Sequence, residues 1–308
     1  MSRHAELTII IPVYNRRHIV AKTLASIAAQ TLRPLDVILV DNNSTDGSLQ
    51  HLEEWRRQTE APDFKVTVLT ETHPGAAAAR NRGLDETDTE FVMFFDSDDT
   101  MAPDHARRAI EALKSPEAPD IVGWDINMHL LDGTIACKPF YSADALWHCV
   151  MHGSMGTLRW AANTGLVRKA GCWNPSIMGW DDIELGARML LLSPRIKRLD
   201  GPVTVDVFSQ EFSITGTDFA SGARKWEGSL DAIECSMPDR RRKRYVNLRR
   251  ALLAGDYARE GDKAASDRLL SCALAQEQCP FYRALLRFAR TYVAAGHRGC
   301  ARLLRPLF

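Results

Sequence analysis

The chain alternates between two periods of apolar and polar positions. Short runs rich in β-branched residues predict strands, and the segments between them repeat apolar residues with helical spacing. Such an alternation predicts an α/β fold with a mainly parallel central sheet flanked by helices. The predicted strands are residues 7–13, 37–40, 66–69, 91–95 and 120–124, and the predicted helices are 18–30, 47–58, 75–84 and one that follows Pro103.

The second half of the chain has a different pattern. After Asp125 the alternation loosens, and the stretch to about residue 210 mixes short strands with one clear helical segment, residues 181–192. From residue 216 onward nearly every segment has helical spacing, ending in an apolar, arginine-rich stretch at 282–304. The sequence therefore predicts two domains, an α/β domain at 1–215 and a helical, basic C-terminal extension at 216–308.

Polar turns follow four of the predicted strands. In an open α/β sheet, ligands bind outside the carboxyl ends of the strands, so these turns should meet at one edge. The turn at 41–47, Asp-Asn-Asn-Ser-Thr-Asp-Gly, is also explained as a tight turn with a helix N-cap. The four turns are residues 12–16, 41–47, 70–75 and 96–99.

Three aspartates follow the apolar strand at 91–95. Asp96, Asp98 and Asp99 would repel one another and raise their pKa values unless a cation were present. Mg²⁺ or Mn²⁺ is the expected cation, because these ions take carboxylate oxygens together with water and substrate phosphates. A helix N-cap ahead of Pro103 would account for only one of the three.

Two further charged groups have both structural and chemical interpretations. Arg80 lies on a small-residue helix, where its guanidinium could bind phosphate or simply lie in solvent. Asp181, Asp182 and Glu184 open a helix, and its dipole explains two of the three carboxylates. Asp182 is the candidate for a general base.

Composition and charge indicate where the protein is located and which partners it can bind. Seven scattered cysteines without a C-x-x-C pair favour a reducing cytosol, and no apolar run reaches the roughly 18 residues of a membrane span. The expected protein is cytoplasmic, soluble or peripherally attached, and does not bind nucleic acid. The formal net charge is zero, but residues 239–308 hold 16 Lys and Arg against 6 Asp and Glu. This tail could contact an anionic membrane with its arginines, or pack as an ordinary helix with those arginines in water.

The strand-end motifs, in this order and at these intervals, resemble those of family 2 glycosyltransferases over residues 6–215. The resemblance implies a GT-A fold and an inverting reaction. It implies a nucleoside-diphosphate sugar donor, with a UDP-sugar expected first, a saccharide or lipid-linked acceptor, and a divalent metal. The motifs are Ile-Ile-Ile-Pro-Val-Tyr-Asn (9–15), Val-Asp-Asn-Asn-Ser-Thr-Asp-Gly (40–47), Ala-Arg-Asn-Arg-Gly (79–83), Phe-Asp-Ser-Asp-Asp (95–99) and Trp-Asp-Asp-Ile-Glu-Leu (180–185).

Carried over by position, the resemblance assigns a role to each motif. Asp182 takes the place of the family's catalytic aspartate, and Asp181 replaces the glutamate that usually precedes it. The metal ligands are Asp98 and Asp99, and which of the three clustered aspartates contacts the ion directly stays open. The residues implied to lie on the bound nucleotide are Pro12, Tyr14, Asp41, Arg80, Asp96 and Asp98.

Three other functions fit parts of the sequence. Residues 96–100 spell D-x-D-x-T, the nucleophile motif of haloacid-dehalogenase-like phosphatases, but that motif sits on the first strand of its domain. Sugar nucleotidyltransferases use a glycine-rich loop after the first strand, where this chain has Tyr14-Asn15-Arg16-Arg17. A non-catalytic nucleotide-sugar-binding or scaffold protein would not need Asp182.

Overall fold

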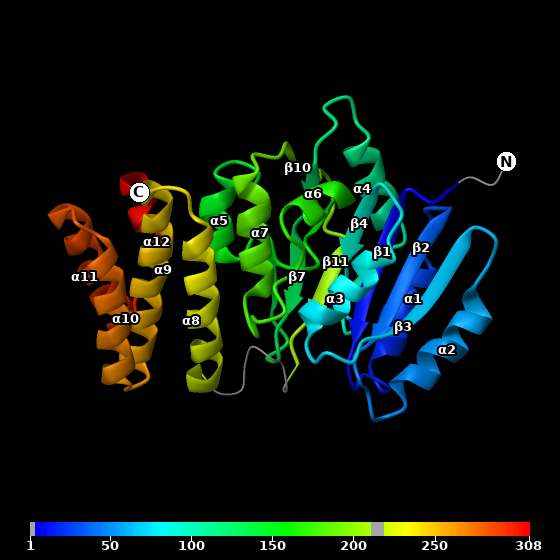
Figure 1. Cartoon of the computed structure of the whole chain (residues 1–308), viewed down its shortest axis with the longest axis horizontal. Helices are drawn as coiled ribbons and strands as arrows, with labels where there is room; N and C mark the ends of the chain where they lie inside the picture. Colours follow the sequence, from blue (N-terminus) through cyan, green and yellow to red (C-terminus); the bar gives the residue numbers. More distant parts are fainter. Residues whose placement is uncertain (1–3, 211–218) are drawn as a thin grey trace. The chain divides into compact units, whose positions relative to one another are not determined.

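A computed structural model of the protein describes residues 4–210 and 219–308, which form two compact units (Figure 1). The first unit comprises residues 4–145, 154–176 and 188–210, and the second comprises 146–153, 177–187 and 219–308. The domain boundary predicted near residue 215 lies outside the described residues. Within them, no helix combines the length and apolarity that crossing a bilayer requires.

The first unit is organised by a seven-stranded sheet. All neighbouring strands are parallel except β9, which runs antiparallel to both of its neighbours. The predicted α/β fold with a mainly parallel sheet is therefore confirmed. The strands, in their order across the sheet, are β10 (Ile196–Arg198), β6 (Ile121–Gly123), β9 (Trp160–Asn163), β4 (Phe91–Phe94), β1 (Leu7–Val13), β2 (Leu35–Asp41) and β3 (Phe64–Thr70).

Strand β1 lies at the centre of the parallel part and is buried along its whole length. A continuous apolar run is what burial on both faces of a parallel sheet requires. Helix α3 packs on β1 and β2 through small residues, and Gly83 marks the closest approach. The helices of this unit are α1 (Val20–Ala28), α2 (Ser48–Thr59), α3 (Ala76–Asp85), α4 (His105–Leu113) and α6 (Thr164–Lys169).

A second, four-stranded sheet was not predicted from the sequence. Its strands β5 and β11 are only two and four residues long, too short to show an apolar period. It brings the backbone of Phe208, at the end of β11, beside the aspartates that follow β4. The strand order is β5 (Thr100–Met101), β11 (Val205–Phe208), β7 (Ile126–His129) and β8 (Ile135–Lys138).

The second unit is helical, with α9 packed against α8, α10 and α11. The apolar stretch at 282–304, predicted as one helical segment, is two helices. Gly296 and Gly299 separate them with φ angles of 85° and 82°, which favour glycine. The helices with residues in this unit are α5 (Ala145–His152), α7 (Asp181–Leu191), α8 (Phe219–Ser236), α9 (Arg240–Arg259), α10 (Lys263–Gln276), α11 (Pro280–Ala294) and α12 (Cys300–Leu304), followed by a 3₁₀ turn, η1 (Arg305–Leu307).

Replacing Gly83 by alanine should destabilise the first unit. A Cβ at this position would come within 2.5 Å of Ile10 Cγ2 and 3.3 Å of Val40 Cγ2, both on central strands. The added methyl group overfills this contact, and we expect a loss of roughly 1–3 kcal/mol in the free energy of unfolding, measured by urea denaturation.

The matched control is Gly228→Ala in α8, where the added Cβ would meet nothing within 4 Å. That change should be neutral or stabilising by up to about 1 kcal/mol, because alanine is the better helix former. Equal stability of the two variants would contradict the close α3–sheet contact.

Candidate active site

The turns after β1 and β2 are joined by side chains that bond to backbone. Asn15 adopts a φ of 49°, and its N–H donates to Ser44 Oγ at 3.0 Å. The Arg16 N–H donates to Ser48 Oγ at 2.9 Å, and Asn15 Oδ1 accepts from the Thr45 N–H at 2.8 Å. These bonds hold the two strand ends as one rigid edge.

Asn42 connects this edge to the turn after β3. Its side-chain amide donates to the carbonyls of Glu71 and His73, at 2.9 and 2.7 Å, and its Oδ1 accepts from the Gly75 N–H at 2.7 Å. In the 41–47 motif, the Asn and Ser side chains therefore have a structural role in the turn, as the interpretation of this motif as a tight turn expects.

Asp41 differs from its neighbours in that motif. The residue is 3% exposed, and its Oδ2 accepts from the Ser44 N–H at 3.1 Å. Its Oδ1 is buried and has no donor among the described residues. One residue after β1, Tyr14 is 58% exposed, whereas Pro12 is buried inside that strand. The edge thus presents an unused acceptor and an uncovered aromatic ring.

The three aspartates after β4 lie together, and burial makes the charges of Asp98 and Asp99 costly. Burial, followed by the charges of Asp96 and Asp98, raises the pKa of Asp99 to about 8. Burial and the charge of Asp96 also raise the pKa of Asp98. Asp99 Oδ1 accepts from the Phe208 N–H at 2.8 Å, which partly favours the ionised form.

Three cationic side chains surround these carboxylates. The buried Arg80 guanidinium pairs with Asp96 Oδ1 at 3.0 Å and lies 4.4 Å from the centre of the Trp173 ring. A nitrogen of Arg16 lies 4.0 Å from Asp98 Oδ2. The ammonium of Lys22 stands 3.7 Å over the Phe208 ring, and its charge lowers the pKa of both Asp98 and Asp99. Arg80 is thus a buried partner of Asp96, and contact of its guanidinium with phosphate stays a prediction.

The donor set at this cluster fits a divalent metal. Two carboxylates whose pKa values are raised by burial and by each other gain most from a nearby cation. Among residues 4–210 and 219–308, no group of three His, Cys, Asp or Glu side chains is arranged to hold an ion alone. Asp98 and Asp99 suit a hard cation that completes its shell with water and substrate phosphates.

Asp182 belongs to the second unit, in the first turn of α7. The residue is half-buried, and its Oδ1 accepts from the Ile183 N–H at 2.7 Å. Asp181 is half-buried and Glu184 is buried in the same turn, where the helix dipole favours carboxylates. The base role of Asp182 stays a prediction.

Sequence reasoning missed Arg16, Lys22 and Phe208. Arg16 could have been found, because it lies in the turn after β1 beside the predicted site. Lys22 could not have been found, because it is an ordinary lysine on α1. Phe208 could not have been found either, because it contributes a backbone N–H from a short strand that is distant in the sequence.

Part of the chain is similar to a known protein family. Residues 8–126 match the family described as Glycosyl transferase family 2. The chain is 35% identical over 112 residues to the succinoglycan biosynthesis protein ExoW of Rhizobium meliloti, covering 35% of this chain and 34% of ExoW. It spans between 16% and 41% of the length of eight curated relatives that it matches.

The fold resembles solved structures along nearly the whole chain. S. aureus TarS 1–349, in complex with UDP-GlcNAc, gives a TM-score of 0.66 at 18% identity, covering 98% of this chain and 92% of that one. The mannosyltransferase PcManGT of Pyrobaculum calidifontis, in complex with GDP-Man and Mn²⁺, gives 0.52 at 19% identity, covering 99% and 88%. These likenesses confirm the GT-A fold expected from the sequence.

Asp99→Asn should flatten the pH dependence of stability in the metal-free protein. The folded-state pKa of Asp99, about 8, lies above its ordinary value of 3.8. Its stabilising contribution is therefore fully present below the unfolded pKa and is lost as the pH rises through the folded pKa. Between those values the wild-type free energy of unfolding should fall by at most about 1.4 kcal/mol per pH unit, measured by urea denaturation in EDTA.

Asn at this position keeps the acceptor for the Phe208 N–H, so the variant tests the charge alone. Asp88→Asn, at an exposed position outside the cluster, should keep the wild-type slope. If Asp99→Asn also keeps that slope, the raised pKa is wrong.

Proposed function

We propose that this chain, whose residues 8–126 match Glycosyl transferase family 2, is an inverting glycosyltransferase. It moves a sugar from a nucleoside-diphosphate sugar to a hydroxyl group of a saccharide or lipid-linked acceptor, in the synthesis of a polysaccharide or cell-envelope glycan. The observation that carries the proposal is the carboxylate cluster, in which Asp99 is buried, beside an edge where Asp41 Oδ1 has no donor among the described residues. The name of ExoW supports the polysaccharide context.

The nucleoside of the donor binds at the edge formed by β1 and β2. The exposed ring of Tyr14 offers a surface for stacking, next to the end of the strand that holds Pro12. The buried Oδ1 of Asp41 has no donor in the part of the chain that the structure describes, and an N–H group of a base such as uracil would supply one. The UDP-GlcNAc in the TarS complex supports a UDP-sugar as the donor.

The diphosphate of the donor would lie at the aspartate cluster, where Mg²⁺ or Mn²⁺ would be held. Asp98 and Asp99 are the proposed ligands, and Asp96 stays paired with Arg80 beside the nucleotide. A bound divalent ion would neutralise the charge that develops on the leaving diphosphate. The Mn²⁺ in the PcManGT complex supports this choice of ion.

Asp182 is the proposed general base. It takes the proton of the acceptor hydroxyl as that oxygen attacks the anomeric carbon of the donor. The bond between this carbon and the diphosphate oxygen breaks on the opposite side, and its electron pair leaves with the nucleoside diphosphate. One displacement of this kind inverts the anomeric configuration and needs no covalent sugar–enzyme intermediate.

A thermal-shift screen of UDP-, GDP- and dTDP-sugars with and without Mn²⁺ tests donor binding. We expect a UDP-sugar with Mn²⁺ to raise the melting temperature most, because ligands that bind only the folded state stabilise it. Asp98→Asn should remove the Mn²⁺-dependent part of this rise, and Asp88→Asn should not. A rise that is equal with Mn²⁺ and with EDTA would argue against the metal site.

Asp182→Asn should separate binding from transfer. With the donor found by the screen, we expect the rate of transfer to fall by about 10²–10⁴, while the thermal shift caused by the donor is kept. Asp181→Asn removes one charge from the same helix turn and should have a much smaller effect. Unchanged transfer by Asp182→Asn would exclude it as the base.

The C-terminal helices support a further part of the proposal, contact with an anionic membrane. Phe281, Phe288 and Leu303 are 53%, 43% and 54% exposed, and Arg287 and Arg302 are exposed near them in sequence. Other arginines of this tail bond within their own unit. Arg283 donates to the carbonyls of Leu274 and Glu277, and Arg290 pairs with Asp267 at 3.2 Å.

Co-sedimentation with phosphatidylserine vesicles tests this contact. Binding should weaken as salt is added, since surface charges are screened, and should weaken again in the double variant Phe281→Ser and Phe288→Ser. Leu131→Ser, at a position 66% exposed in the first unit, is the matched control. If the wild-type chain does not co-sediment with the vesicles, the proposed membrane contact is wrong.

A further inference from the structure

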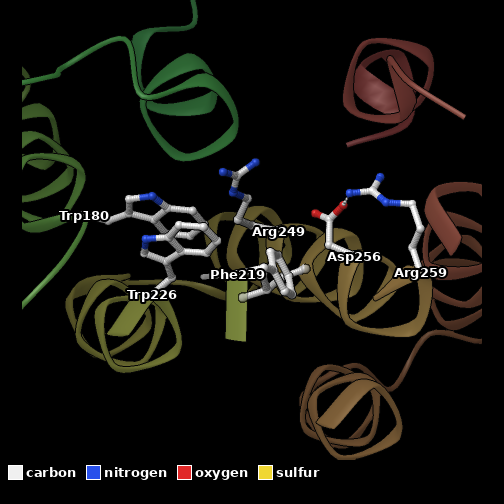
Figure 2. Close-up of a pocket in the computed structure, with 7 residues that line it drawn as sticks. Trp180, Phe219, Trp226, Arg249, Asp256 and Arg259 are labelled. Atoms are coloured by element: carbon white, nitrogen blue, oxygen red, sulfur yellow. Dashed lines mark ion pairs between the residues drawn. The ribbon is translucent and has the colours of Figure 1, made fainter. Parts of the chain in front are cut away.

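The second unit contains a pocket of about 300 Å³ that the proposed transfer reaction does not use. Figure 2 shows two indole rings on one side of it and the Asp256–Arg259 ion pair on the other, with Arg249 and Phe219 between them. The rings of Trp180 and Trp226 are stacked, with centroids 5.0 Å apart and planes 3° from parallel. The ring of Phe219 meets that of Trp226 edge-on at 6.0 Å. The pocket therefore has an aromatic wall and a charged wall.

Trp180 is held in a backbone conformation that bulky residues avoid. Its φ is 54°, a left-handed value that costs about 1–3 kcal/mol for such a residue. The surroundings keep it there: Ser229 bonds to the carbonyl of Gly179, and a Cβ at Gly179 would lie only 3.3 Å from Trp226 Cδ1. Strain of this kind concentrates at binding sites. The next residues along the chain are Asp181 and the proposed base, Asp182.

The guanidinium of the half-buried Arg249 supplies a positive charge at this pocket. It lies 4.4 Å from the centre of the Trp180 ring and donates to the Met151 carbonyl at 3.1 Å. Its Nε is buried without an acceptor, and no carboxylate of the described residues lies within 4.0 Å of its nitrogens. Burial lowers its pKa to about 10, so it stays charged at neutral pH. A cation this well enclosed has capacity for an anionic partner.

We propose that this pocket is an acceptor subsite that binds a sugar ring carrying an anionic group. Aromatic side chains offer their faces and edges to the apolar C–H face of the sugar, and Arg249 pairs with its carboxylate or phosphate. Asp256 and Arg259 accept from and donate to its hydroxyl groups. The inference rests on the proposed glycosyl transfer and deepens it, because it adds an acidic saccharide as the class of acceptor.

The dimensions and chemistry of the pocket favour this ligand over others. Small-molecule pockets span roughly 300–1,000 Å³, and this volume lies at the lower end, where one or two sugar rings fit. A lipid chain would leave the buried Nε of Arg249 without an acceptor and would cover the Asp256–Arg259 ion pair with apolar groups, which is costly. The pair of tryptophans and the paired acid and base instead match a ligand with one apolar face and a polar rim.

Direct binding to the full-length protein tests the proposal without any transfer reaction. Isothermal titration and tryptophan fluorescence are recorded with a disaccharide that ends in glucuronic acid, a neutral disaccharide of the same size, glucose 6-phosphate and inorganic phosphate. We expect saturable binding of an acidic sugar, at least about tenfold tighter than that of the neutral disaccharide. The uronate and phosphate arms show which anion is preferred.

Two variants and one control locate the binding site. Arg249→Lys keeps the charge but loses the planar fork, and Trp226→Leu removes half of the ring pair; each should weaken acidic-sugar binding about tenfold. Arg241→Lys, exposed on the same helix α9, should bind as the wild type does. The donor-induced thermal shift shows that each variant is folded and that its donor site is intact.

The outcomes separate this inference from the proposed function. Binding of an acidic sugar that both variants weaken supports the subsite, even if transfer is never observed. Binding that neither variant changes, equal binding of the neutral disaccharide, or tight binding of inorganic phosphate alone would overturn it. A donor-induced thermal shift without any binding of acidic sugars would also overturn the subsite while leaving the glycosyltransferase proposal standing.

Discussion

The repulsion among Asp96, Asp98 and Asp99 is the constraint on which the surroundings of the β4 end depend. Burial removes the water that would otherwise screen their charges, and the pKa of Asp99 rises to about 8. The first unit offsets part of this cost with Arg80 on Asp96, Arg16 near Asp98 and a backbone N–H on Asp99. Each of these groups comes from a different strand end or helix. The cluster therefore forms only when these strand ends and helices are correctly aligned with one another.

That alignment was largely predictable from the sequence. The parallel strands are long apolar runs, and the polar turns that follow them must meet at their carboxyl ends. The structure adds that the side chains of Asn15 and Asn42 form hydrogen bonds with the backbone of neighbouring turns. Their role is to hold the edge rigid, which leaves Asp41 Oδ1 and the Tyr14 ring available to a ligand.

Other parts of the site depend on contacts that local patterns do not encode. The antiparallel strand β9 inserts between β4 and β6, and it supplies Trp160 to a ring cluster with Phe94 and Trp173. Trp173 in turn covers the guanidinium of Arg80. An arginine among alanines on a helix is ordinarily exposed, so its burial follows from a residue more than ninety positions away. Sequence periodicity carries no information about such a partner.

Both units hold features that cost free energy in the ligand-free chain. The first holds crowded carboxylates, and the second holds Trp180 at a φ of 54° beside a guanidinium that has no carboxylate of the described residues within 4.0 Å. A neutral residue in place of a clustered aspartate, or glycine in place of Trp180, would avoid this cost. A ligand that relieves the cost gains affinity by the same amount and stabilises the folded chain through mass action. A cation with a diphosphate at the first feature, and an anionic sugar at the second, are the partners whose charges meet that condition.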